Sequence, residues 1–349
     1  RFMAALKGEP TDRVPLFPLL MLLAVDRAGI TYKKYVTAGT ALADAQLLVQ
    51  QRFDLDAITA CSDAFRISAD LGGEMIYPRD TPPFVSQPLI RTVEDLHRLG
   101  HPDPTDPKSR MGDRVHAVAS MARAVSGQVA LLGWVDMPLA EACSACGVTE
   151  FMLLLKDDPL GAHQILEYLT GVVIDFALAQ VEVGADMIGA GDEVASLISP
   201  AMYAEFDLPY EQQVCEAIHN AGSMDKLHIC GQTAQPLDQM ATSGADLFNV
   251  DHLVPLEQAR DVYAAQGKCF KGNLDPVENI MRATPDQCAE LAHECMALCA
   301  EDRYMLSAGC DIPAETPVEV FEAFCNAPKV NAVRVVAGRE GDRIGQEVA

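Results

Sequence analysis

His228 and Cys230 are the two residues whose types and spacing point most clearly to chemistry. They lie at the end of a β-like apolar run, Lys226 to Cys230, and Gly231 follows directly. In an extended strand, residues i and i+2 project from the same face, so the imidazole and the thiol would lie side by side. A glycine after a strand lets the backbone turn sharply into a loop that carries function. The pair therefore predicts one arm of a metal site, whose third ligand must come from elsewhere.

Polar side chains also follow the other β-like runs of the sequence. They are Asp63, Trp134 with Asp136, Asp192 with Glu193, Asp251 with His252, Asn273 with Asp275, and Cys310 with Asp311. Each alone is unremarkable, because such residues commonly cap helices and form loops. Together they include a further thiol, and one His with two Cys is a set that zinc favours, with a fourth position open to water or substrate. We therefore predict zinc held by His228, Cys230 and Cys310.

Several other candidates have a plainer interpretation beside the chemical one. Cys143 and Cys146 have the spacing of a redox or zinc pair, but they start a helix and have no second pair, so we expect them to pack. His219 and Cys215 are expected to be packed core residues. Glu193 is equally compatible with a metal ligand, a general base and a residue that merely precedes a helix.

The elements that must position these residues alternate along the chain. Eight β-like runs start near residues 14, 55, 129, 185, 226, 245, 269 and 304, and single helical crossovers join the last five. This alternation predicts a (β/α)8 TIM-type barrel over residues 1–349, with an N-terminal extension and an irregular insertion at 72–87 after the second strand. Active sites of such barrels lie at the C-terminal ends of the strands. The alternative is a doubly wound sheet, but Gly189-Ala190-Gly191 lacks the spaced third glycine of a dinucleotide site.

Composition limits the possible partners. With 26 basic and 50 acidic side chains, the formal charge of −24 argues against nucleic acid or an anionic membrane surface. No uninterrupted apolar run reaches the ~20 residues of a spanning helix, and we identify no signal peptide. The eleven cysteines are scattered through a long acidic chain, so we expect reduced thiols and a cytoplasmic protein.

Four segments resemble the uroporphyrinogen decarboxylase superfamily over nearly the full chain. They are the entry from Ala4 to Pro15, Ile198 to Phe206 with Pro209-Tyr210, Lys271 to Pro276, and Gly309 to Pro313 with Thr316-Pro317. Within the superfamily the chain resembles the corrinoid-dependent methyltransferases, because His228-x-Cys230 and the distant Cys310 match their zinc motif. The decarboxylases carry an arginine-rich segment after the first strand, whereas residues Leu16 to Val25 contain no arginine. This difference argues against decarboxylation.

The resemblance implies a zinc-dependent transfer of a methyl group between a corrinoid and a small thiol, methoxy or methylamine compound. Zinc would deprotonate an acceptor thiol in one direction of transfer, or polarise the leaving heteroatom in the other. The sequence does not distinguish the two directions. No Asp-x-His-x-x-Gly pattern occurs, so the methyl-corrinoid would arrive on a separate protein that docks transiently. The expected catalytic residues are Glu193 and Asp192, with Glu193 also a fourth metal ligand. Expected substrate contacts are Asp251, Asn273, Trp134 and Asp63. A decarboxylase of the same fold and a non-catalytic corrinoid-protein-binding module are the alternatives.

Overall fold

Seven parallel strands form one curled sheet in the computed structural model, which describes residues 1–329. The strands are β1 (Ala57–Thr59), β4 (Ala130–Asp136), β5 (Met187–Gly191), β6 (Met224–His228), β7 (Leu247–Asn249), β8 (Cys269–Leu274) and β9 (Tyr304–Ala308). Their spatial order follows the chain, β1-β4-β5-β6-β7-β8-β9. This is the order that successive right-handed βα units produce, because each crossover helix returns the chain beside the previous strand.

The first of the eight predicted runs is an extended segment and not a regular strand. It forms one parallel bridge, between Leu16 and Leu306 of β9. Leu306 N donates to Pro15 O (2.8 Å), and on the other side Asp56 N donates to Leu16 O (3.1 Å). The segment therefore lies between β9 and β1 and joins the two edges of the sheet, consistent with a TIM-type barrel. Pro15 and Pro18 have no N–H to donate, which explains why no longer ladder forms.

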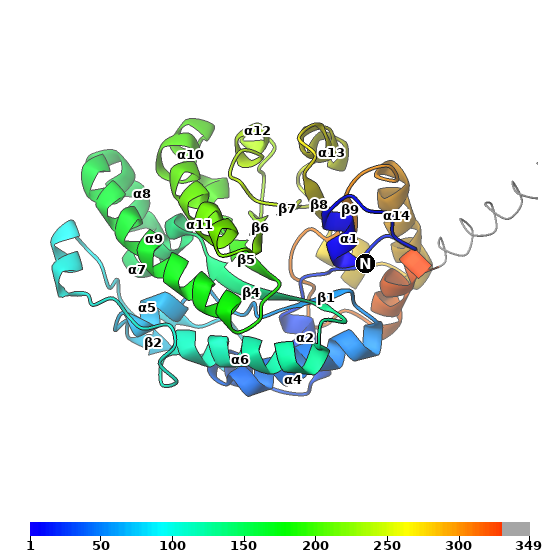
Figure 1. Ribbon diagram of the computed structural model, residues 1–349, viewed down its shortest axis with the longest axis horizontal. Coiled ribbons are helices and arrows are strands. Elements are labelled where there is room, and N and C mark those ends of the chain that lie inside the picture. Colours follow the sequence, from blue (N-terminus) through cyan, green and yellow to red (C-terminus); the bar gives the residue numbers. More distant parts are fainter. Residues whose placement is uncertain (330–349) are drawn as a thin grey trace, which may run out of the picture.

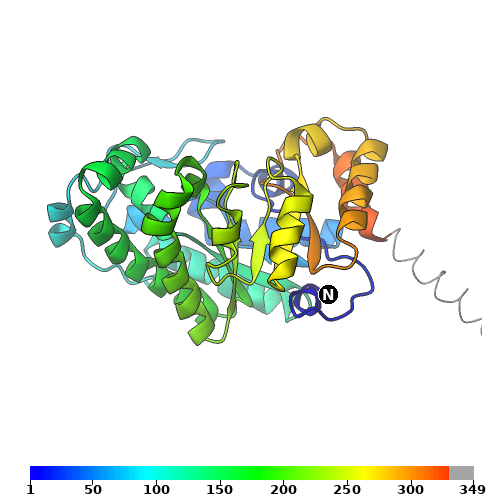
Figure 2. The ribbon, with the colours of Figure 1, turned by 90° about the horizontal axis from the view of Figure 1, so that it is seen from above.

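Helices surround the strands on the outside (Figure 1). The described helices are α1 (Phe2–Leu6), α2 (Leu22–Arg27), α3 (Tyr32–Thr37), α4 (Gly39–Phe53), α5 (Arg66–Asp70), α6 (Arg110–Val125), α7 (Pro138–Cys146), α8 (Val148–Asp157), α9 (Pro159–Glu182), α10 (Pro200–Phe206), α11 (Leu208–Asn220), α12 (Leu237–Met240), α13 (Leu256–Ala265), α14 (Pro285–Leu298), the short helical turns Val93–Arg98, Glu193–Leu197 and Pro276–Met281, and the helical residues 318–329. Seen from above, the green segments that include α9 and α11 lie at one end of the molecule, and the orange segments that include α14 lie at the other (Figure 2).

One of the crossovers predicted as a single helix is divided. Between β5 and β6, α10 and α11 meet at Asp207. Pro209 stands in the first turn of α11, and a proline cannot donate the backbone hydrogen bond that would continue the preceding helix. The sequence reading also missed α8, which follows α7 after Gly147.

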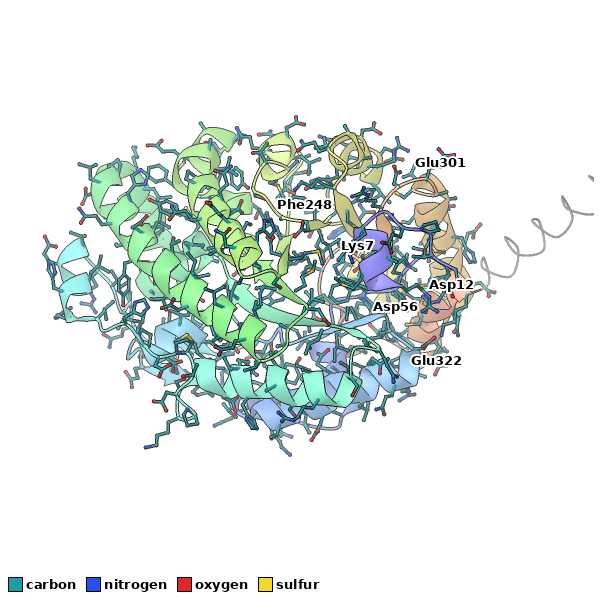
Figure 3. The ribbon with its side chains drawn as sticks, viewed as in Figure 1. Lys7, Asp12, Asp56, Phe248, Glu301 and Glu322 are labelled. Atoms are coloured by element: carbon teal, nitrogen blue, oxygen red, sulfur yellow. The ribbon has the colours of Figure 1, made fainter. Side chains whose placement is uncertain are left out.

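The N-terminal extension begins with α1, which packs against the inward-facing side chains at the N-terminal ends of the strands. Phe2 meets Phe17 edge to face at 5.3 Å between ring centroids, in a buried cluster with Ala57, Ala130 and Met305. Close by, Arg1 binds both Asp12 and Asp56, and Figure 3 shows Lys7 and these two carboxylates beside α1. The main apolar core is separate and lies between the outward faces of the strands and the helices.

The irregular insertion predicted at 72–87 contains a two-stranded antiparallel hairpin. β2 (Met75–Ile76) pairs with β3 (Phe84–Val85), and the hairpin follows β1 and α5 in the chain. The prediction of one domain over residues 1–349 extends beyond the described residues and stays a prediction.

Among the described residues, α9 is long and apolar enough to cross a membrane. It packs on α7, α11 and β4, and 56% of its most apolar window is buried, which is the pattern of a core helix in a soluble protein. The cytoplasmic location itself stays a prediction.

Two glycines of β5 make room for the single tryptophan inside the barrel. A Cβ at Gly189 would lie 2.5 Å from the Trp134 ring, and one at Gly191 would lie 2.9 Å from Asp136 Oδ1. Both glycines share the inward face of β5, because strand residues alternate between the two faces. Glycines are therefore needed at 189 and 191 of β5, because Trp134 and Asp136 of β4 occupy the space that a larger side chain would fill.

We expect Gly189→Ala to destabilise the fold by ~1–3 kcal/mol, the usual cost of overpacking a core. Thermal unfolding would measure the change. Gly100→Ala is the control, because a Cβ there meets no atom within 4 Å, and its effect should be small. Equal unfolding temperatures for Gly189→Ala and the parent chain would contradict the packing argument.

Candidate metal centre

The three predicted zinc ligands meet at the C-terminal end of the barrel. His228 is the last residue of β6, Cys230 follows two residues later, and Cys310 lies two residues beyond β9. The predicted strand over 226–230 is displaced, because β6 spans 224–228, and Cys230 is already in the loop. Gly231 has a positive φ of 95°, which supports the predicted sharp turn after Cys230.

The three donor atoms lie within hydrogen-bonding distance of one another. Cys230 Sγ is 2.9 Å from His228 Nε2 and 3.3 Å from Cys310 Sγ, and Cys310 Sγ is 3.6 Å from His228 Nε2. The hydrogen bond between the thiols lowers the pKa of Cys310 and raises that of Cys230. Burial lowers the pKa of His228, so its imidazole is neutral, as a metal ligand must be. All eleven cysteines are free thiols, as expected.

This donor set fits zinc. Zn–S bonds of ~2.3 Å and Zn–N bonds of ~2.0 Å in a tetrahedron separate the ligand atoms by roughly 3.3–3.8 Å, so the observed contacts need only a small expansion. Nδ1 of His228 is buried and has no hydrogen-bond partner among the described residues. Zinc-bound histidines usually donate from the second nitrogen, so this atom lacks the usual outer partner.

The donors line one side of a pocket of about 280 Å³. Its other lining residues are Leu19, Met21, Tyr32, Cys61, Ser62, Asp63, Ala64, Phe65, Pro82, Trp134, Asp136, Gly191 and Glu193. The lining contains no arginine or lysine, so the absence of arginine from Leu16 to Val25 is not compensated from other elements. A pocket of this size and polarity suits a small substrate rather than one with many carboxylates.

Asp136 is the buried acid of this pocket. The sequence pattern named it with Trp134 as a strand-end polar residue but assigned it no role. Burial raises its pKa to about 8, against the opposing effect of Arg66, whose Nη2 lies 3.4 Å from Oδ2. Trp134 Nε1 donates to Oδ1 at 3.3 Å. The carboxyl therefore keeps its proton at neutral pH. Its position two residues after Trp134 on the inward face of β4 was the signal in the sequence for a role in the site.

Two buried lysines inside the barrel were also missed. Lys226 shares the inward face of β6 with His228, and its Nζ lies 4.5 Å from the Trp134 ring centroid. Burial lowers its pKa to about 8. Lys271 Nζ donates to Phe17 O (2.9 Å) and to Ser307 Oγ (3.0 Å). Burial, and then the neighbouring Lys226, lower the pKa of Lys271 well below its ordinary value. Both amines come from strands that also carry or adjoin the pocket.

Asp63 lines the pocket, but its carboxylate is occupied by arginines. Arg110 binds both oxygens, at 2.9 and 3.0 Å, and Arg66 and Arg114 lie 3.4 and 3.6 Å away. These guanidiniums hold the pKa of Asp63 well below its ordinary value although burial opposes them. Asp63 therefore anchors the pocket wall, and the predicted substrate contact finds no free oxygen.

Replacing Asp63 with asparagine should destabilise the fold by ~3–5 kcal/mol, because it leaves buried arginine charges without their anion. Chemical denaturation would measure this loss. The control is Glu278→Gln, which breaks the exposed pair with Arg282 and should cost less than ~1 kcal/mol. In the parent chain, the ionised Asp63 contributes to the free energy of unfolding. This contribution is complete above the ordinary aspartate pKa and is lost as the pH falls toward the lowered pKa of Asp63 in the folded chain. A loss below ~1 kcal/mol in the asparagine variant would refute this account.

The two predicted catalytic acids lie on opposite sides of the sheet. Glu193 is exposed and lines the pocket, but it is not among the atoms grouped around His228, Cys230 and Cys310. Asp192 continues the outward face of β5 and is fully buried with Asp207 and Glu211, where burial raises its pKa well above the ordinary value. The position of Asp192 does not support a catalytic role, and that of Glu193 does not support a fourth metal bond without movement.

Two predicted substrate contacts lie outside the pocket. Asn273 lines a neighbouring pocket of about 620 Å³, and its Nδ2 donates to Val254 O (2.7 Å) and Asp251 O (3.3 Å). Asp251 is buried, and its Oδ1 accepts from Leu253 N at 2.9 Å. Both residues hold the loop after β7. Of the four predicted substrate contacts, the structure places Trp134 and Asp63 in the pocket.

The fold and the site together define a barrel enzyme with a His-Cys-Cys donor set at the mouth of the barrel. The family model described as Uroporphyrinogen decarboxylase (URO-D) matches residues 1–330, so the chain belongs to this family. It is 25% identical over 306 residues to uroporphyrinogen decarboxylase of Hydrogenovibrio crunogenus, covering 83% of this chain and 84% of that protein. It is 28% identical over 299 residues to the same-named protein of Xanthomonas campestris pv. campestris, covering 79% and 81%.

A solved methyltransferase from Methanosarcina mazei shares the fold, with a TM-score of 0.84, 24% identity, and coverage of 93% of this chain and 96% of that one. A B12-independent methionine synthase from Shewanella sp. is more distant, with a TM-score of 0.56, 12% identity, and coverage of 94% and 98%. At these identities the likeness shows the fold alone.

These findings correct the predicted function. The similar curated proteins from several species are named uroporphyrinogen decarboxylase, which favours the decarboxylase alternative over corrinoid-dependent methyl transfer. The zinc-motif match gave too much weight to three residues, since related barrels can carry the same ligands for different reactions. A docking corrinoid protein and its methyl-corrinoid stay predictions that no described contact tests.

Proposed function

We propose that this chain is a zinc-dependent decarboxylase of the uroporphyrinogen decarboxylase family that acts on a small carboxylate substrate. The observation that carries the proposal is the meeting of His228, Cys230 and Cys310 at a small, mainly apolar pocket that also contains the protonated Asp136. The reaction class follows the names of the relatives, and the substrate size follows the pocket.

Loss of CO₂ leaves an electron pair on the substrate carbon, and a proton must replace the carboxyl group. Zinc, when bound by the three donors, would supply a Lewis acid for the developing negative charge. Asp136 holds a proton at neutral pH, and its place in the pocket suits a general acid. The indole of Trp134 orients this carboxyl through its N–H. Leu19, Met21 and Phe65 cover the pocket with apolar surface and so limit access of water.

The absence of arginine and lysine from the pocket lining defines the expected substrate. A tetrapyrrole with many carboxylates would need several cationic partners, whereas a small substrate could bind the metal through the oxygen of its electron-accepting group. We therefore expect a monocarboxylate or dicarboxylate with an electron-accepting group beside the carboxyl-bearing carbon.

The proposal is tested with purified protein of measured zinc content. Small oxo and aromatic carboxylates are supplied one at a time, and CO₂ release is followed with and without added zinc. Zinc-dependent release from at least one compound is expected, with little turnover of a porphyrinogen. Methyl transfer from free methylcobalamin to a thiol, with no CO₂ from any carboxylate in the panel, would overturn the proposal.

A further inference from the structure

A second cluster of metal-ligating side chains lies on the outer side of the sheet, far from the pocket. His219 is in the last turn of α11, Asp225 is the second residue of β6, and Asp246 directly precedes β7. The sequence reading expected His219 to be a packed core residue, but its side chain is 37% exposed. Asp225 precedes His228 by three residues and faces the opposite side of the strand, so the two clusters are separated by about 10 Å along β6.

The positions of the three side chains are fixed by the backbone. Asp225 N donates to Asp246 Oδ2 (3.1 Å), and Asp246 N donates to Asp225 O (3.1 Å), which ties the starts of β6 and β7 together. The turn from α11 to β6 contains Gly222, with a φ of 79°, and it returns the end of α11 onto the sheet. His219 is thereby held against two carboxylates that are already in place.

The hydrogen bonds of the cluster leave one buried acceptor unfilled. Nε2 of His219 lies 3.0 Å from Asp246 Oδ2, with hydrogen-bond geometry, and 2.9 Å from Asp225 Oδ1. A single N–H cannot serve both oxygens. Asp225 is fully buried, its Oδ2 accepts from Cys215 Sγ (2.9 Å), and its Oδ1 has no hydrogen-bond donor among the described residues. Asp225 Oδ1 therefore faces the ring nitrogen as an ion pair at 2.9 Å without receiving its N–H, and a shared cation would serve all three groups.

We propose that His219 Nε2, Asp225 Oδ1 and Asp246 Oδ2 bind a second divalent transition-metal ion, such as zinc, between α11 and the sheet. All three atoms lie within 4.8 Å of one another, and one imidazole with two carboxylates is a ligand set that zinc accepts. Zn–N and Zn–O bonds of ~2.0–2.2 Å need the observed contacts to open by only a few tenths of an ångström. Two carboxylates neutralise the ion, and the exposed edge of the histidine gives it access from solvent.

The end of α11 adds a further favourable contribution. The last backbone carbonyls of a helix carry a partial negative charge, which stabilises a cation near its C-terminus. In the absence of metal the same charges favour the protonated imidazole, and Asp225 and Asp246 raise the pKa of His219 to about 9. The metal ion would replace the proton on His219 Nε2. It would also bind Asp225 Oδ1, which that proton does not reach. Its role would be to join α11 to the starts of β6 and β7.

The test uses the full chain in which Cys230 and Cys310 are both serine, so that the barrel-mouth donors no longer hold zinc. After treatment with a chelator, zinc binding is measured by calorimetry and by metal analysis. One equivalent is expected to remain, and Co²⁺ in its place should give weak visible bands without the intense thiolate-to-metal absorption of a cysteine site.

Adding His219→Ala should weaken this binding by more than the ~10–100-fold that loss of an outer-shell partner costs. Asp246→Asn provides a second variant, and circular dichroism checks that each is folded. The matched control is His101→Ala, because His101 pairs with Asp175 at 2.6 Å on the surface without a second carboxylate. Zinc binding absent from the double-serine chain, or undiminished by both His219→Ala and Asp246→Asn, would overturn the proposal.

Discussion

Cys310→Ser is expected to remove one equivalent of zinc and to lower CO₂ release by about 10³-fold, because a metal Lewis acid contributes several kcal/mol to transition-state stabilisation. The loss follows from the geometry, since Cys310 Sγ contacts both other donors, at 3.3 and 3.6 Å. Serine replaces a soft thiolate with a hydroxyl that ionises poorly and binds zinc weakly. Metal analysis and turnover of the same preparation measure the two effects together.

Cys61→Ser is the matched control for this change. Cys61 lines the same pocket but contacts Met21 Sδ at 3.3 Å instead of the donor set. Its replacement should leave the zinc content unchanged. Cys230→Ser and His228→Ala should behave like Cys310→Ser. Full zinc retention in all three would show that the assigned ligands are wrong, and zinc loss with full activity would separate the metal from the reaction.

Asp136→Asn is expected to lower kcat by ~10²–10⁴-fold, the range of a positioned general acid, with a smaller change in KM. Asparagine has nearly the same shape as the protonated carboxyl but cannot give up a proton to carbon. Asp136 is protonated below its pKa of about 8, so the activity of the parent chain should fall as pH rises through that value. The residual activity of Asp136→Asn should not show this decrease as the pH rises.

The same group gives a stability test with a defined sign. Between the ordinary aspartate pKa and about 8, the folded chain holds a proton that the unfolded chain releases. The free energy of unfolding contributed by Asp136 therefore decreases as pH rises through this window, and Asp136→Asn should flatten the decrease. Glu257→Gln in the neighbouring pocket is the control and should alter neither profile. An unchanged kcat and pH profile in Asp136→Asn would exclude this residue as the acid.

The sequence resemblance pointed to methyl transfer, whereas the similar curated proteins are named decarboxylases. This difference has a physical basis. Three metal ligands can be recognised in the sequence, but the reaction depends on what else faces the ligand. The pocket lining contains no cationic side chain, and its acid is Asp136, to which the sequence pattern assigned no role.

Features that depend on local periodicity could be predicted from the amino-acid sequence. Seven of the eight apolar runs start within a few residues of the seven strands, and the first run, near residue 14, lies where the edges of the sheet meet. The spacing of His228 and Cys230 placed both at the end of one strand, and the count of strand ends led to Cys310. These are properties of neighbouring residues or of chain order, which parallel βα units convert directly into position.

Which strand-end side chains share a pocket depends on how the chain folds in three dimensions. Asp192 and Glu193 are adjacent in sequence, but the alternation of β5 turns the first toward α10 and α11 and leaves the second at the pocket. Asp63 has its charge neutralised by arginines up to 51 residues away, from Arg66 to Arg114. His219 meets one carboxylate in β6 and another that directly precedes β7. Such pairings depend on contacts distant in the chain, and a single sequence records neither the partner nor the direction of the side chain.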